Sequence, residues 1–148
     1  MKVSVIIVFF FFFGQGVYSQ EHGLHNRITS QVWETIAQIK HKVVDEYEYY
    51  PIFDEKMKAL DGKMVTLKGY IVPVKEGVTH SSFLLSVLPI NQCFYCGKNG
   101  IPMMVEVKTK RPVSYSENVV TVKGKMNLYK VNAAFACPVV IQEAIVSE

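Results

Sequence analysis

The segment of residues 63–74 constrains the fold more than any other part of the chain. It follows the turn dipeptide Asp61-Gly62 and alternates its side chains with the two-residue period of a β-strand. Gly69 stands in the middle of this strand, and a glycine there indicates a bend or the close approach of another backbone. Strands bend in this way at the corners of small barrels, so the segment predicts a barrel strand.

Four further segments have strand character, and turn-forming residues or loops separate them. They cover residues 82–88, 103–108, 119–128 and 138–146. With 63–74 they predict a mainly β fold, a small five-stranded barrel of the oligonucleotide/oligosaccharide-binding (OB) kind. A β-sandwich is the alternative.

A short helix and one extra strand are predicted before the barrel. Trp33 and Ile36 fall on one face of a helix over 31–38. Residues 39–50, rich in β-branched and aromatic side chains, are then predicted to form a strand. One or two helical turns are expected at 54–60.

The first nineteen residues have the pattern of a secretory signal peptide. A lysine precedes an apolar run at 3–13, which is shorter than the roughly 20 residues of a membrane-spanning helix. Cleavage is expected after Ser19, with an uncleaved anchor as the alternative. The predicted organisation is a signal peptide at 1–19, a flexible lead-in at 20–28 and a single β-barrel domain at 29–148.

The charge of the mature chain bears on its partners. Removing the signal peptide leaves fifteen Lys and Arg against thirteen Asp and Glu, a formal charge of +2. So small an excess argues against a nucleic-acid partner. The expected product is soluble, periplasmic or secreted, without a transmembrane segment after cleavage, and its partner is an unidentified ligand or envelope protein.

Cys93 and Cys96 form a Cys-x-x-Cys motif that Gly97 follows. Two thiolates at this spacing can hold one metal ion at zinc–sulfur distances of about 2.3 Å. An exported compartment equally permits a disulfide between them. A thiol-exchange enzyme is less favoured, because the residues after the motif indicate a loop rather than the helix start that lowers the pKa of redox thiols.

Cys137 makes the cysteine count odd, so one thiol is left over if the other two pair. Strands that alternate in direction would bring Cys137 and the Cys93–Cys96 loop to one end of the barrel and His80 to the other. The candidate metal ligands are therefore Cys93, Cys96 and Cys137. Three sulfur donors suit a soft metal such as zinc or copper(I).

Several motifs, taken in order, carry a resemblance to a known family. They are Gly-Lys-x-Val-x-Leu-x-Gly-Tyr-x-x-Pro at 62–73, Phe-x-Leu-Ser at 83–86, Cys-Phe-x-Cys-Gly at 93–97 and Val-Val-Thr-Val-Lys-Gly-Lys at 119–125. Together with Trp33 they resemble an uncharacterised family of bacterial exported or periplasmic proteins with OB-like predicted barrels. The resemblance implies a compartment and a fold, and it marks the cysteines and the glycine of the third motif as suspected functional positions. It implies no reaction.

Several other residues that could bind a ligand are expected to have ordinary structural roles instead. Trp33 is expected in the core, although its ring could also stack on a ligand. The basic residues Lys108, Lys110 and Arg111 are expected on a solvated face.

The preferred interpretation is an exported, non-enzymatic binding domain whose Cys93–Cys96 loop binds a metal ion or is locked by a disulfide. Zinc and copper are the candidate metals. Two alternatives stay open. One is a metal-handling or thiol-redox protein of the cell envelope, and the other is a structural or interaction module of an envelope complex.

Overall fold

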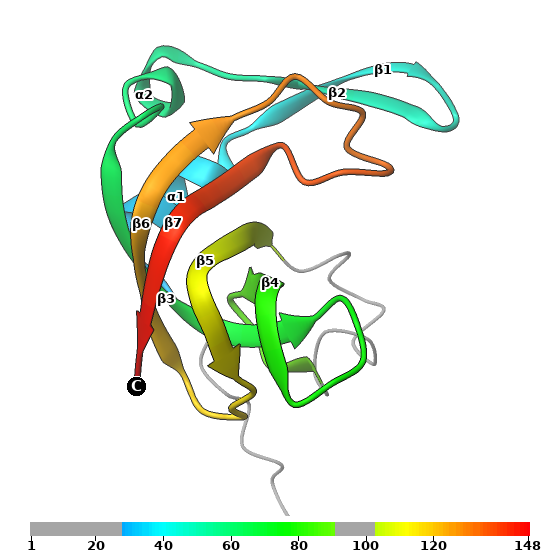
Figure 1. Ribbon diagram of the computed structural model, residues 1–148. Coiled ribbons are helices and arrows are strands. Elements are labelled where there is room, and N and C mark those ends of the chain that lie inside the picture. Colours follow the sequence, from blue (N-terminus) through cyan, green and yellow to red (C-terminus); the bar gives the residue numbers. More distant parts are fainter. Residues whose placement is uncertain (1–27, 91–102) are drawn as a thin grey trace, which may run out of the picture.

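Five strands close into a barrel in the computed structural model, which describes residues 28–90 and 103–148 (Figure 1). The order around the barrel is β3-β4-β5-β7-β6. The bounds are β3 Met64–Pro73, β4 Thr79–Ser86, β5 Met104–Ser114, β6 Val120–Leu128 and β7 Val139–Ser147. The predicted mainly β fold with a five-stranded barrel is confirmed, and the sandwich alternative is wrong.

The barrel contains one parallel pair of strands. β5 and β7 run parallel, with Glu106 opposite Val140, whereas the other neighbouring strands are antiparallel. Parallel neighbours begin at the same end of a sheet, so the starts of β5 and β7 lie together. Strand directions alternate along the chain as predicted, but β7 is inserted between β5 and β6.

Gly69 marks the corner at which β3 changes partners. Residues Met64 to Gly69 pair with β6, and Tyr70 to Pro73 pair with β4. A Cβ at Gly69 would lie 2.6 Å from Cγ of Leu85 and 2.8 Å from the carbonyl oxygen of Ser86. The bend and close backbone approach predicted at this glycine are thus both present.

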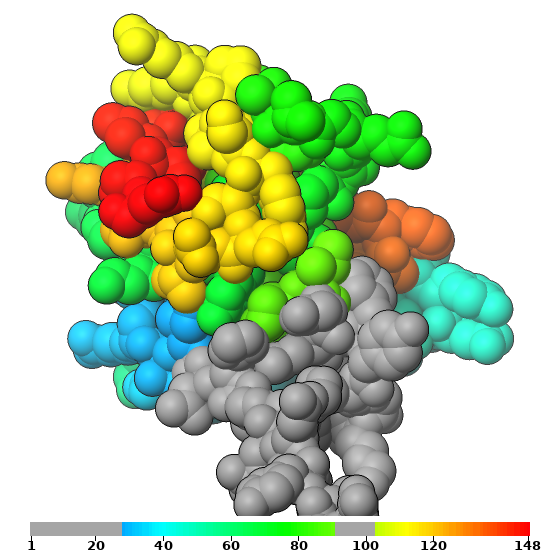
Figure 2. All heavy atoms as spheres, turned by 90° about the horizontal axis from the view of Figure 1, so that it is seen from below, coloured from blue at the N-terminus to red at the C-terminus, as the bar shows by residue number. Residues whose placement is uncertain are grey.

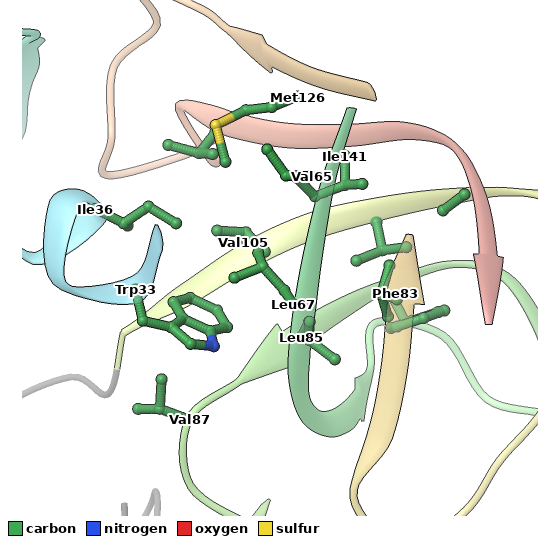
Figure 3. Packing of buried hydrophobic residues seen from close by; sticks show 14 of the residues in the cluster. Trp33, Ile36, Val65, Leu67, Phe83, Leu85, Val87, Val105, Met126 and Ile141 are labelled. Atoms are coloured by element: carbon green, nitrogen blue, oxygen red, sulfur yellow. The ribbon is translucent and has the colours of Figure 1, made fainter. Parts of the chain in front are cut away.

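The core fills the barrel and continues beneath a short helix, α1 (Gln31–Ala37). Figure 3 shows Trp33 of this helix near Leu67 of β3 and near Val87, which directly follows β4, and Ile36 belongs to the same cluster. The Trp33 side chain is 1% exposed, and its indole N–H donates a 2.8 Å hydrogen bond to the carbonyl oxygen of Lys68. Trp33 is therefore a core residue that fixes α1 to β3, as predicted.

The helix begins where the sequence predicts. The Ser30 hydroxyl accepts a hydrogen bond from the Trp33 backbone N–H, which satisfies one of the free donors of the first turn. A second short helix, α2 (Glu55–Lys58), lies within the predicted 54–60. The carboxylate of Asp54, which caps this helix, accepts a 2.8 Å hydrogen bond from the Met57 backbone N–H.

A two-stranded hairpin, β1 (Lys40–Asp45) and β2 (Glu48–Ile52), projects from the barrel (Figure 1). The prediction of a single strand over 39–50 is wrong. The chain reverses after Asp45, whose carboxylate accepts a hydrogen bond from the Tyr47 backbone N–H at 2.8 Å. No glycine or proline lies in this turn, so the sequence lacks the usual hairpin signal.

β4 and β5 are longer than predicted, at residues 79–86 and 104–114 instead of 82–88 and 103–108. The far part of β5 is charged, and its side chains are largely exposed, so its sequence resembles a solvated loop. Pairing with Thr79 and His80 of β4 holds this part of β5 in the sheet. Among the described residues, no helix is long and apolar enough to cross a membrane.

Candidate functional site

Cys137 lies at the barrel end where β5 and β7 begin. Its Sγ is 3.3 Å from the carbonyl oxygen of Val139 and 3.7 Å from that of Met104. Met104 opens β5, the strand that follows the Cys-x-x-Cys motif along the chain. Cys93 and Cys96 are outside the described residues, so their association with Cys137 stays a prediction.

The surroundings of Cys137 favour the neutral thiol. Burial raises the pKa of the Cys137 thiol above its ordinary value, and the negative charge of Glu106 acts in the same direction. Hydrogen bonds with the backbone at Val139 and Glu106 oppose this shift. A cation bound beside the sulfur would favour the thiolate, because metal ligation requires the deprotonated form.

The described residues do not form a metal site by themselves. Over 28–90 and 103–148, no three His, Cys, Asp or Glu side chains are grouped to hold an ion. Cys137 is a partly exposed sulfur donor, and sulfur is the donor that zinc and copper(I) favour. The predicted ligand set fits these metals only if Cys93 and Cys96 complete it.

A shallow hollow of about 230 Å³ opens at this barrel end, between α1 and the start of β5. Apolar side chains of Ile28, Trp33 and Met103 line it, and Glu34 lies at its wall. Hydrogen bonds from the Ile28 N–H to the Val87 carbonyl oxygen and from the Val87 N–H to that of Met103 join the two sides. The hollow was not predicted from the sequence, because the residues that line it lie far apart in the chain. Among them, only Trp33 stood out in the sequence.

His80 lies at the opposite end of β4. It pairs with Val113, whereas Ser86 at the other end of the strand pairs with Met104. The His80 side chain is 5% exposed, and its Nε2 has no hydrogen-bond partner among the described residues. His80 is therefore a packed residue at a distance from Cys137.

The predicted basic cluster lies along β5, and neighbouring acids offset part of its charge. Lys108 is 3.4 Å from Glu106, and Lys110 is 3.6 Å from Glu143. The Lys110–Glu143 pair is exposed, and pairs of this kind contribute little to stability. The arrangement agrees with a solvated face.

No protein-family model and no curated protein matches this chain. Among solved structures, a DUF3299 family protein from Pseudomonas aeruginosa PAO1 is similar, with 24% sequence identity and a TM-score of 0.45. The match covers 66% of this chain and 68% of that one. A likeness of this size assigns neither a family nor an activity to the chain.

Proposed function

We propose that the chain is an exported, non-enzymatic binding domain that holds zinc or copper through Cys93, Cys96 and Cys137. Alternatively, Cys93 and Cys96 form a disulfide instead of binding metal, and Cys137 is then a free thiol. Both states belong to a mature protein that begins at Gln20 and is periplasmic or secreted.

The position of Cys137 is the observation that carries this proposal. Its sulfur contacts the first residue of β5, and only seven residues lie between Cys96 and Met104 along the chain. Cys93 follows Ile90, the last residue described after β4, by three residues. Chain connectivity therefore supports a meeting of three sulfurs at this barrel end, since each residue spans at most about 3.6 Å.

The proposed ligand set is incomplete as a structural zinc centre. Structural zinc is bound by four ligands, and three thiolates leave one position for a water or a partner's donor group. Three thiolates also suit copper(I), which prefers soft ligands. An open position would make the domain a metal-binding module that can engage an external ligand.

The test is elemental analysis by mass spectrometry together with thiol titration. The mature protein is purified from its exporting compartment without chelators or a histidine tag, and its intact mass establishes whether it begins at Gln20. We expect about one zinc or copper per chain. The metal content should fall at least tenfold in a Cys93→Ser/Cys96→Ser variant and severalfold in Cys137→Ser.

His41→Ala is the matched control, because His41 is an exposed potential ligand on β1 and should leave the metal content unchanged. Trp33 fluorescence checks that each variant is folded. No metal and one free thiol per chain would mean the disulfide-locked state. No metal and three free thiols would contradict both states.

A further inference from the structure

The β1–β2 hairpin has one covered edge and one open edge. On the β2 side, the Asn132 side chain accepts a hydrogen bond from the Tyr49 N–H and donates one to the Tyr47 carbonyl oxygen. The Ala133 N–H adds a 2.7 Å hydrogen bond to the Tyr49 carbonyl oxygen. Over residues 28–90 and 103–148, β1 pairs with β2 alone, so its other edge has no strand partner.

The side chains of the open strand are exposed to solvent. All six residues of β1 are exposed, including Val43 at 61% and Val44 at 56%. Figure 2 shows the hairpin and the orange segment between β6 and β7 projecting together beyond the barrel. An exposed strand edge with apolar side chains is a template for pairing with another chain.

The charges along this strand select the kind of partner. The sequence from residue 40 to 46 is Lys-His-Lys-Val-Val-Asp-Glu, basic in its first part and acidic in its last. In an antiparallel pair of two such strands, the basic part of each lies opposite the acidic part of the other. A parallel pair would instead set like charges side by side, which destabilises cross-strand pairs. The strand is therefore complementary to itself.

We propose that β1 pairs antiparallel with β1 of a second copy of this chain, about a two-fold axis close to Val43 and Val44. The two hairpins would form one four-stranded sheet between two barrels. Six-residue strands bury much less than the roughly 1,200–2,000 Å² of a stable interface. The dimer is accordingly weak, concentration-dependent and sensitive to salt.

Sedimentation velocity on the reduced mature chain measures this association. We expect the average mass to rise from one protomer toward two as the protein concentration increases. Raising the ionic strength from about 0.05 M to about 0.5 M should lower the dimer fraction, because salt screens the exposed charges.

Two variants test the antiparallel arrangement directly. Lys40→Glu/Lys42→Glu replaces both lysines of the strand with acids, and Glu46→Lys leaves one acid and one base in its last part. These three side chains are exposed and have no ion pair among the described residues. Each variant alone should show at least a tenfold weaker dimer, and an equimolar mixture should regain dimers that contain one chain of each kind.

Lys75→Glu is the matched control, since Lys75 is exposed in the connection between β3 and β4. It should dimerise like the parent chain. A parent chain that stays monomeric at every concentration would overturn the proposal. So would a dimer that both variants retain, because it would use another surface. The readout is independent of metal content, so failure here leaves the thiol-site proposal intact.

Discussion

At the scale of single residues, His80 is the polar side chain with the least evident reason to be buried. Its Nε2 lies inside the protein with no partner among the described residues. A buried polar atom without a hydrogen bond costs about 1–3 kcal/mol of stability. His80 lies far from Cys137 in the sheet, so its burial does not contribute to the thiol site.

Replacing His80 with leucine should leave the free energy of unfolding unchanged or raise it by up to about 2 kcal/mol. The leucine has a similar size and carries no polar atom that would need a partner. Urea unfolding followed by Trp33 fluorescence measures the change. His41→Leu, at an exposed position, is the control and should shift stability by less than about 0.5 kcal/mol. A loss above about 2 kcal/mol for His80→Leu would show that the ring has a partner.

Residues that a local sequence pattern marks were predictable from the sequence. Gly69 and Trp33 were both predicted correctly, because a central glycine and an apolar helix face are local patterns. The contact between Cys137 and Met104 joins residues 33 positions apart. It depends on which strands are neighbours, and strand order is not encoded in local periodicity.

At the scale of elements, local sequence patterns were the poorest guide to two parts of the chain, the hairpin and the segment after β6. Asn132 fixes the two together, since its side chain bonds to both Tyr47 and Tyr49 and also accepts from the Ala134 N–H. A two-stranded hairpin is only marginally stable by itself in water. Its order therefore depends on a contact from residues more than 80 positions away.

Asn132→Ala should loosen the hairpin while the barrel stays folded. Three hydrogen bonds are lost, each with a net contribution of roughly 1 kcal/mol. We expect hydrogen exchange of the amides at 47–50 to accelerate at least tenfold, with unchanged exchange in β6. Asn118→Ala, at an exposed position outside the strands, is the control. Unchanged exchange in the hairpin would mean that other contacts hold it.

At the scale of the whole molecule, α1 and the barrel share one hydrophobic core. Trp33 packs in the same cluster as residues from all five barrel strands, among them Leu67, Phe83, Val105 and Ile141. The helix has only seven residues and would not form alone in water. The two parts are thus expected to gain and lose structure together.

Unfolding by urea should therefore give one midpoint whether it is followed by Trp33 fluorescence or by far-ultraviolet circular dichroism. Trp33 is the single tryptophan of the chain, so its emission reports on the junction of α1 with the barrel. Coincident curves are the mark of a two-state transition. A fluorescence change that precedes the loss of strand signal would show that α1 detaches first.

The partner change of β3 at Gly69 also leaves the first half of this strand without its β6 neighbour for a time during synthesis. The first half of β3 pairs with β6, where Met64 lies opposite Lys125, 61 residues later in the chain. At roughly 5–20 residues per second, the ribosome needs about 3–12 s to make that stretch. For that time β3 has an unsatisfied edge, and the nascent chain cannot complete its barrel. During this time the unpaired edge of β3 is open to pairing with another chain.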